Sequence, residues 1–262
     1  MNIYLDLTRE FNRGRLRCII SSGQAVVLHR LAIMSKDGDW IIREDVEATQ
    51  HTLRVLAEHG ARYRFGAPLD VRWLAGGWSA HFEFRHGALR VRTDFVSRPP
   101  RLASAELNRL WEQPPAGWPV LPPPQLAQIK QTNREKDYVV IGELARLMND
   151  PADQFLHSRS AADLLTLAVQ HPGLVSRLIP QRPLLAVISQ GRDALEPALD
   201  AERRQLIRLN AQRLQRYARA AEAWAAAWPD VERQTARLDL CAAHQFLVSR
   251  AEDTLPFSPA VE

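Results

Sequence analysis

The sequence predicts an α+β protein, in which a small mixed β-sheet flanked by helices precedes a helical C-terminal region. Short runs rich in β-branched and aromatic residues lie before residue 97, and glycine turns separate several of them. Eight of the 17 prolines lie in residues 99–124 and interrupt this pattern. Beyond them, apolar residues recur at helical spacing. We therefore expect a first domain at 1–150, with a proline-rich connection at 99–124, and a helical domain at 151–262.

The expected elements follow from local patterns. A turn at 21–23 separates a short apolar strand from a segment that opens a helix. The run at 44–59 has apolar residues on one helical face, and Gly60 ends it. The expected strands are 16–20, 40–42, 69–74, 79–85 and 89–96, and the later helices are about 125–148, 153–170 and 199–249.

Composition indicates a soluble globular protein. Hydrophobic residues make up 46% of the 262 residues and charged residues 24%. No apolar run approaches the ~20 residues of a membrane span, and the N-terminus lacks a signal-peptide core. Cys18 and Cys241 are too few for a disulfide framework or a zinc site. We expect a cytoplasmic protein that does not bind membranes.

Charge alone does not identify a partner. The net charge of +4 is too small to indicate nucleic-acid binding. Of the 34 basic residues only three are lysine, namely Lys36, Lys130 and Lys136. Lysine is a compact point charge that can contact a phosphate. The sequence shows no Ser/His/Asp triad, P-loop or dinucleotide-binding fingerprint.

The stretch SKDGDWII, residues 35–42, places two carboxylates two residues apart at the start of an apolar strand. Residues i and i+2 of a strand point to the same side, so Asp37 and Asp39 are expected side by side. Paired carboxylates, with waters and substrate phosphates, suit Mg²⁺. The alternative is a solvent-exposed turn, because Asp-Gly is a strong turn signal.

A third carboxylate lies in the strand LRVRTDFV, residues 89–96. Alternation places Arg90, Arg92 and Asp94 on one face and apolar residues on the other. A charged face at the centre of a strand is typical of a site. If this strand lies beside 40–42, three carboxylates converge and can hold two Mg²⁺ ions.

These segments, taken in order, resemble the minimal nucleotidyltransferase-fold family, in its bacterial branch that includes abortive-infection and toxin–antitoxin nucleotidyltransferase toxins. The resemblance covers roughly residues 18–148. It is carried by four segments: Ser22 to His29, Ser35 to Asp39, Arg92 to Phe95, and Lys130 with Arg134 to Asp137.

The resemblance implies roles for these residues. Asp37, Asp39 and Asp94 are implied as catalytic metal ligands, with Asp94 also a base for the acceptor hydroxyl. The implied nucleotide-binding residues are Ser22, Gly23, Lys36, Lys130, Arg134 and Lys136, with Asp137 pairing a basic neighbour. The implied reaction is Mg²⁺-dependent transfer of a nucleoside monophosphate from a nucleoside triphosphate, ATP included, to a hydroxyl of RNA (tRNA in the toxins), protein or a small molecule. An antitoxin protein is an implied partner.

The sequence departs from the family pattern at three positions. The turn reads Ser-Gly, Gly38 replaces an apolar residue between the aspartates, and Ile33 replaces a frequent arginine. These departures favour a second interpretation, a catalytically degenerate protein that binds nucleotide, RNA or a partner protein. A third is a nucleic-acid-binding or scaffold module that acts through arginines of the helical region.

Overall fold

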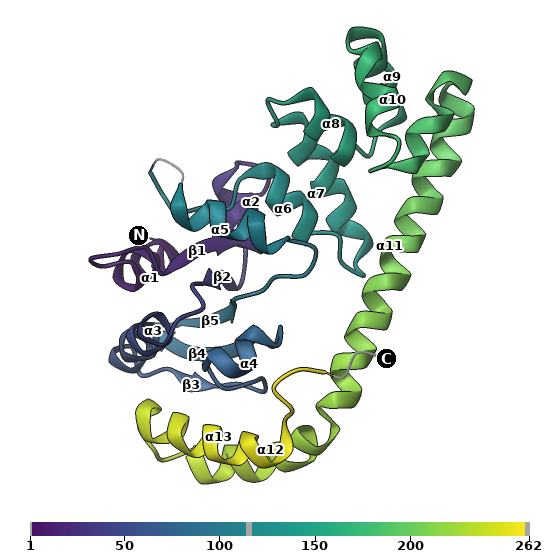
Figure 1. Ribbon diagram of the computed structural model, residues 1–262. Helices are drawn as coiled ribbons and strands as arrows, with labels where there is room; N and C mark the ends of the chain where they lie inside the picture. Colours follow the sequence, from purple (N-terminus) through teal and green to yellow (C-terminus); the bar gives the residue numbers. More distant parts are fainter. Residues whose placement is uncertain (1, 114–116, 260–262) are drawn as a thin grey trace. The chain divides into compact units, whose positions relative to one another are not determined.

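The computed structural model describes residues 2–113 and 117–259 and confirms the α+β class. Its five-stranded sheet has the order β1-β2-β5-β4-β3 (Figure 1). Within the described sheet, strands β2 and β5 pair in parallel, and every other pair of neighbouring strands is antiparallel. The strands are β1 (Cys18–Ser21), β2 (Gly38–Ile42), β3 (Arg62–Tyr63), β4 (Ala80–His86) and β5 (Leu89–Val96).

Helices flank the sheet and make up most of the later chain. No helix in the described part of the chain is long and apolar enough to cross a membrane. The helices are α1 (Ile3–Phe11), α2 (Ser22–Leu28), α3 (Val46–Glu58), α4 (Val71–Ala75), α5 (Ser104–Glu112), α6 (Pro123–Ile129), α7 (Glu135–Arg146), α8 (Pro151–His157), α9 (Ala161–Gln170), α10 (Pro172–Leu178), the 3₁₀ helix η1 (Pro183–Gln190), α11 (Arg192–Ala220), α12 (Glu222–Thr235) and α13 (Leu240–Thr254).

The chain forms two compact units. The first comprises Met1–Leu121 and Gln215–Glu262, and the second comprises Pro122–Leu214. The predicted limits, 1–150 and 151–262, differ from this division in two ways: residues 122–150 belong to the second unit, and the C-terminal segment packs on the sheet unit. There α13 contacts α3, and the indole N–H of Trp73 donates to the carbonyl of Leu255 at 3.0 Å.

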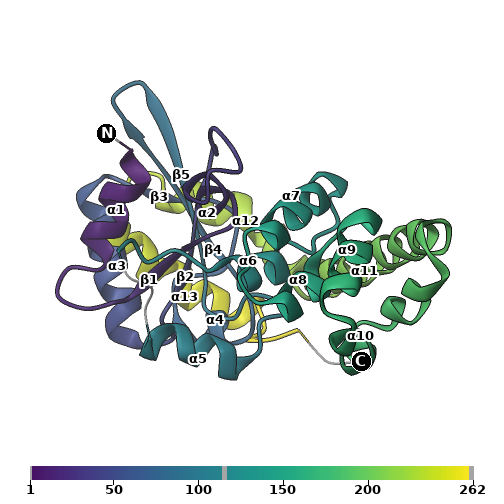
Figure 2. The ribbon, with the colours of Figure 1, turned by 90° about the horizontal axis from the view of Figure 1, so that it is seen from above.

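The core of the first unit is aromatic. Trp40 of β2 and Phe95 of β5 stack with their ring centroids 5.4 Å apart, and Phe11 of α1 meets both rings edge-on. Helices α1 and α3 contact each other on this unit, and Figure 2 shows the β4–β5 hairpin projecting from the sheet. Since strand side chains alternate, the neighbouring residues of β2 and β5 point to the opposite face.

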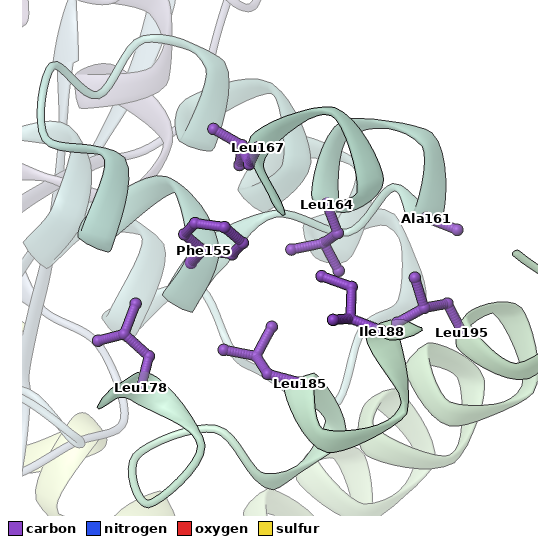
Figure 3. Close-up of a cluster of buried hydrophobic side chains, with 8 residues drawn as sticks. All are labelled: Phe155, Ala161, Leu164, Leu167, Leu178, Leu185, Ile188 and Leu195. Atoms are coloured by element: carbon purple, nitrogen blue, oxygen red, sulfur yellow. The ribbon is translucent and has the colours of Figure 1, made fainter. Parts of the chain in front are cut away.

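The second unit has its own apolar core, drawn in Figure 3. Phe155 and Leu164, both fully buried, belong to it. The further buried members come from α9, α10, η1 and α11, so five consecutive helical segments, from α8 to α11, share one cluster. They are Ala161, Leu167, Leu178, Leu185, Ile188 and Leu195.

Some expected elements are wrong. Residues 69–74 form no strand, because the Asp70 side chain accepts from the backbone N–H of Arg72 and begins helix α4. Strand β3 and helix α1 were not predicted. Each of the helices expected at 125–148 and 153–170 is two helices, and the run expected at 199–249 is three.

Candidate functional site

Two rows of polar side chains cross the sheet on the face opposite the aromatic core. We call them the Asp39 row and the Asp37 row. The Asp39 row runs through Ser21, Asp39, Asp94, His81 and Arg64, and the Asp37 row runs through Asp37, Arg92, Glu83 and Arg62.

The register of three strands builds the Asp39 row. Parallel pairing sets Asp39 of β2 opposite Asp94 of β5, and antiparallel pairing sets His81 of β4 opposite Asp94. On the other side, Ser21 at the end of β1 pairs with Asp39. The predicted phosphate turn at Ser22 therefore begins one residue from the partner of Asp39.

Asp94 is engaged by two basic groups. Its Oδ1 lies 2.7 Å from Nδ1 of His81 and 3.4 Å from Nη1 of Arg64. His81 in turn contacts the hydroxyl of Ser79, with 2.8 Å between Nε2 and Oγ. A Ser, a His and an Asp thus meet, because Ser79 directly precedes β4, His81 lies on β4, and Asp94 lies opposite His81 on β5.

The Asp37 row contains two groups of ion pairs, one at Asp37 and one at Glu83. Asp37 Oδ1 lies 3.8 Å from Nη1 of Arg92, and buried Glu83 accepts from both Arg62 and Arg90. Burial alone would raise the pKa of the Glu83 carboxyl, but hydrogen bonds and charges from Arg90 and Arg62 outweigh burial and lower this pKa. Glu83 therefore stays ionised and binds Arg62, the last residue of the row.

The start of α2 is packed against the loop that carries Asp37. Buried Gln24 donates from Nε2 to the carbonyl oxygens of Ser35, at 3.1 Å, and Asp37, at 3.4 Å. A Cβ at Gly23 would lie 2.2 Å from Ser35 Oγ, so any other residue here would have to displace the Ser35 hydroxyl. The structure thus brings the predicted phosphate turn and the predicted metal-binding loop together.

The turn itself is strained. Ser22 has φ +49°, in the left-handed region that favours glycine. Serine therefore occupies a conformation that glycine adopts more readily. Strained residues of this kind gather at ligand-binding and catalytic sites.

Three carboxylates act on the hydroxyl of Tyr4. This hydroxyl donates to the carbonyl of Lys36 at 2.7 Å. Burial raises the pKa of Tyr4, the charge of Asp37 raises it further, and Asp39 and Asp94 add smaller increases. The negative potential of all three carboxylates therefore overlaps at one point beside the loop.

The fit of these acids to a divalent cation is partial. Among the described residues, no group of three or more His, Cys, Asp or Glu side chains is placed to hold a metal ion. However, Oδ1 of Asp37 is buried and has no hydrogen-bond partner in the described structure. Mg²⁺ needs only one or two carboxylates, with waters and substrate phosphates as its other ligands. Asp37 and the neighbouring Asp39 meet that smaller requirement.

The predicted basic ligands lie in two places. Lys36 is exposed on the Asp37 loop of the first unit. Lys130, Arg134 and Lys136 belong to the second unit. Lys136 is exposed, whereas Lys130 is buried, with Nζ 3.4 Å from Oδ1 of Asp137.

Asp137 joins two of these basic residues. Its Oδ2 accepts from Nε of Arg134 at 2.9 Å and from the hydroxyl of Thr132. Burial would raise the pKa of Asp137, but the Thr132 hydrogen bond and the charges of Lys130 and Arg134 lower it. Asp137 therefore pairs basic neighbours as predicted, and the Lys130 ammonium is occupied by this pair.

Sequence reasoning missed His81, Arg64, Tyr4 and Gln24. A signal for His81 was present, because Ser79, His81 and Glu83 alternate with Ala80, Phe82 and Phe84 in the strand. Tyr4, Gln24 and Arg64 reach the site only through long-range contacts, which no local pattern reports.

Comparisons with known proteins add one structural similarity. No family model matches the sequence, and no curated protein matches it. A crystal structure from H. pylori, named "putative nucleotidyltransferase", is similar with a TM-score of 0.38 and 14% sequence identity. The similarity covers 81% of this chain and 95% of the other. The function proposed below rests on the geometry of this chain.

Proposed function

We propose that the protein is a Mg²⁺-dependent nucleotidyltransferase that transfers a nucleoside monophosphate from a nucleoside triphosphate to a hydroxyl acceptor. One observation carries the proposal: the parallel β2–β5 register sets Asp39 beside Asp94, with Asp37 two residues away at the entrance of β2. Carboxylates gathered next to a strained turn are the arrangement that the family resemblance leads one to expect.

The chemistry is an in-line displacement at phosphorus. The acceptor oxygen forms a bond to the α-phosphorus, the bond to the bridging oxygen breaks, and pyrophosphate leaves with its electron pair. The acceptor's proton passes to Asp94, the carboxylate held at Oδ1 by His81 and Arg64. When bound, Mg²⁺ supplies positive charge that aligns the phosphates and neutralises the developing negative charge.

Each predicted site residue of the first unit has a role in this proposal. Asp37 and Asp39 would hold Mg²⁺, with Asp94 as the third ligand or the base. Ser22 and Gly23 would approach the phosphates, and exposed Lys36 would contact them. Lys130, Arg134 and Lys136 remain proposed phosphate contacts of the second unit. RNA such as tRNA, or a protein, would supply the acceptor hydroxyl.

The test is binding of each of the four nucleoside triphosphates by calorimetry, with and without Mg²⁺. We expect Mg²⁺-dependent binding by the wild type and its loss in the Asp37→Asn, Asp39→Asn double variant. Asp230→Asn is the matched control, because that exposed carboxylate pairs with Arg233 on α12. Transfer is then followed with α-labelled nucleotide. Equal binding by all three proteins would contradict the proposed site.

One observation favours a second candidate, a degenerate protein that binds nucleotide, RNA or a partner without turnover. The lysine expected to contact phosphate, Lys130, is buried against Asp137. Under this candidate, Mg²⁺-dependent nucleotide binding occurs but no label is transferred to RNA, protein or the chain itself.

A further inference from the structure

The contact between Asp94 and His81 belongs to a three-residue chain. Ser79 Oγ lies 2.8 Å from His81 Nε2, and His81 Nδ1 lies 2.7 Å from Asp94 Oδ1. Both distances are in the ordinary range for strong hydrogen bonds. Ser79 directly precedes β4, and His81 lies two residues later on β4. Asp94 is opposite His81 on β5. The arrangement is therefore fixed by strand register.

The donors and acceptors determine the histidine tautomer. An ionised carboxylate only accepts, so Nδ1 of His81 must carry the proton that it shares with Asp94. In the neutral imidazole Nε2 is then an acceptor, and the Ser79 hydroxyl, which can donate, fills it. The Asp94 carboxylate thereby selects the Nδ1–H tautomer, and the Ser79 hydroxyl, which can donate or accept, holds the ring at Nε2.

The backbone around the imidazole leaves it little freedom. A Cβ at Gly66 would lie 2.4 Å from His81 Cδ2, so the ring occupies the space of the missing side chain. The segment containing Gly66 is tied to β4 at both ends, by Arg64 N donating to His81 O and Ala67 N donating to Ser79 O. The indole of Trp224 donates to the Gly66 carbonyl and holds the segment from the other side.

The consequence falls on Asp94. The hydrogen bonds that the Asp94 carboxylate accepts from His81 and Arg64 both go to Oδ1. The carboxyl group is thus fixed in rotation, and Oδ2 is the oxygen that remains for a substrate proton or a ligand. An unheld aspartate would sample other rotamers, and misplacement by about 1 Å can cost 100-fold in rate.

We propose that His81, oriented by Ser79, is a positioning residue that holds Asp94 for nucleotidyl transfer, so that Oδ2 faces the acceptor hydroxyl. This rests on the proposed function, in which Asp94 takes the acceptor's proton, and it adds two residues that the family resemblance did not indicate. It also separates the two rows: the Asp39 row carries proton transfer, and the Asp37 row is anchored by ion pairs.

The test uses two substitutions that each keep half of the imidazole. His81→Asn keeps an N–H donor near the position of Nδ1, whereas His81→Gln places its amide near Nε2. We expect His81→Gln to lower kcat by about 10- to 100-fold, as loss of an orienting partner typically does, with KM for the nucleotide unchanged. His81→Asn should keep kcat within about threefold of wild type, because the donor to Asp94 persists.

A double-mutant cycle tests the role of Ser79. Ser79→Ala should lower kcat in the wild-type background, because the imidazole loses the contact that holds it at Nε2. In the His81→Asn background the same change should have no effect, since asparagine has no atom at the place of Nε2 for Ser79 to hold. Equal kcat losses for His81→Asn and His81→Gln, or an equal Ser79→Ala effect in both backgrounds, would overturn the proposal. Matched urea midpoints ensure that the variants compared are folded.

Imidazole ¹⁵N chemical shifts give a readout that does not depend on activity. We expect the Nδ1–H tautomer at His81 in the wild type and in Ser79→Ala, because the Asp94 carboxylate sets it. An Nε2–H tautomer with transfer intact would overturn the positioning role alone. The Nδ1–H tautomer with no transfer to any acceptor would instead overturn the proposed function, and the catalytic part of this proposal with it.

Discussion

At the scale of single residues, Gly38 shows why this chain departs from an apolar residue between the two aspartates. A Cβ there would lie 2.4 Å from Cη2 of Trp40 and 2.5 Å from Cδ1 of Tyr4. The two aromatic rings thus occupy the volume that a side chain would fill. The chain thus exchanges an apolar side chain at position 38 for the rings of Trp40 and Tyr4. Asp37 and Asp39 still lie on either side of this position.

Restoring a side chain at this position should therefore destabilise the protein. We expect Gly38→Val to lower the free energy of unfolding by about 1–3 kcal/mol, the usual cost of overpacking a core. Urea denaturation measures this. The control is Gly173→Ala on α10, where no atom lies within 4 Å of the added Cβ, and it should be neutral or slightly stabilising. Similar losses for both variants would contradict the packing explanation.

At the scale of elements, helix α1 secures the strand that carries the site. The hydroxyl of Thr8 accepts from the indole N–H of Trp40 at 2.9 Å and donates to the carbonyl of Tyr4 at 2.6 Å. The Tyr4 hydroxyl reaches the carbonyl of Lys36. Helix α1 thus holds strand β2 at Trp40 and the Asp37 loop at Lys36.

Removing the Thr8 hydroxyl tests this connection. Thr8→Val keeps the shape but leaves the buried Trp40 N–H without its acceptor, which costs about 1–3 kcal/mol. We expect a lower unfolding free energy, together with weaker Mg²⁺-dependent nucleotide binding. Thr166→Val on α9 is the control, because its exposed hydroxyl bonds only to its own helix. A stability loss without any change in binding would mean that α1 supports the fold but not the loop.

The same elements show what a sequence can reveal. Helix α3 and the alternating faces of β4 and β5 were predictable, because burial of one face imposes a period on the apolar residues of the sequence. The sequence predicted that Asp39 and Asp94 converge only if their two strands are neighbours, because the order of strands is set by the whole sheet. The alternating segment at 69–74 satisfied the strand pattern, yet an N-cap at Asp70 outweighed it. The tether from Tyr4 to Lys36 spans 32 residues, and local patterns do not report such contacts.

At the scale of the whole molecule, each unit contains a buried ionic centre. In the second unit, Glu202 pairs with Arg182 at 2.8 Å and with Arg159. His157 lies buried nearby, and burial lowers its pKa from 6.5 to about 4, with further lowering by the charges of Arg159 and Arg182. The histidine is therefore neutral in the folded state at neutral pH.

This burial predicts an acid-sensitive second unit. Between pH 6.5 and about 4 the unfolded chain binds a proton that folded His157 does not. Stability should therefore fall as pH decreases through this window, by up to about 3 kcal/mol. His157→Asn should flatten the dependence, whereas His86→Asn, at an exposed histidine, should not. Hydrogen exchange in peptides from 151–190, corrected for the intrinsic effect of pH, measures it, and an unchanged slope in His157→Asn would contradict the assignment.

The division of the first unit between the two ends of the chain has a consequence for protein synthesis. The ribosome releases Met1–Leu121 first, but Trp73, Trp78 and Gly66 find their partners Leu255, Pro256 and Trp224 only when the last helices emerge. The second unit is continuous in sequence and can fold while translation proceeds. The sheet that carries the three aspartates lacks these partners until α12, α13 and the segment after them have been synthesised, so we expect the proposed activity to arise only after that segment has emerged.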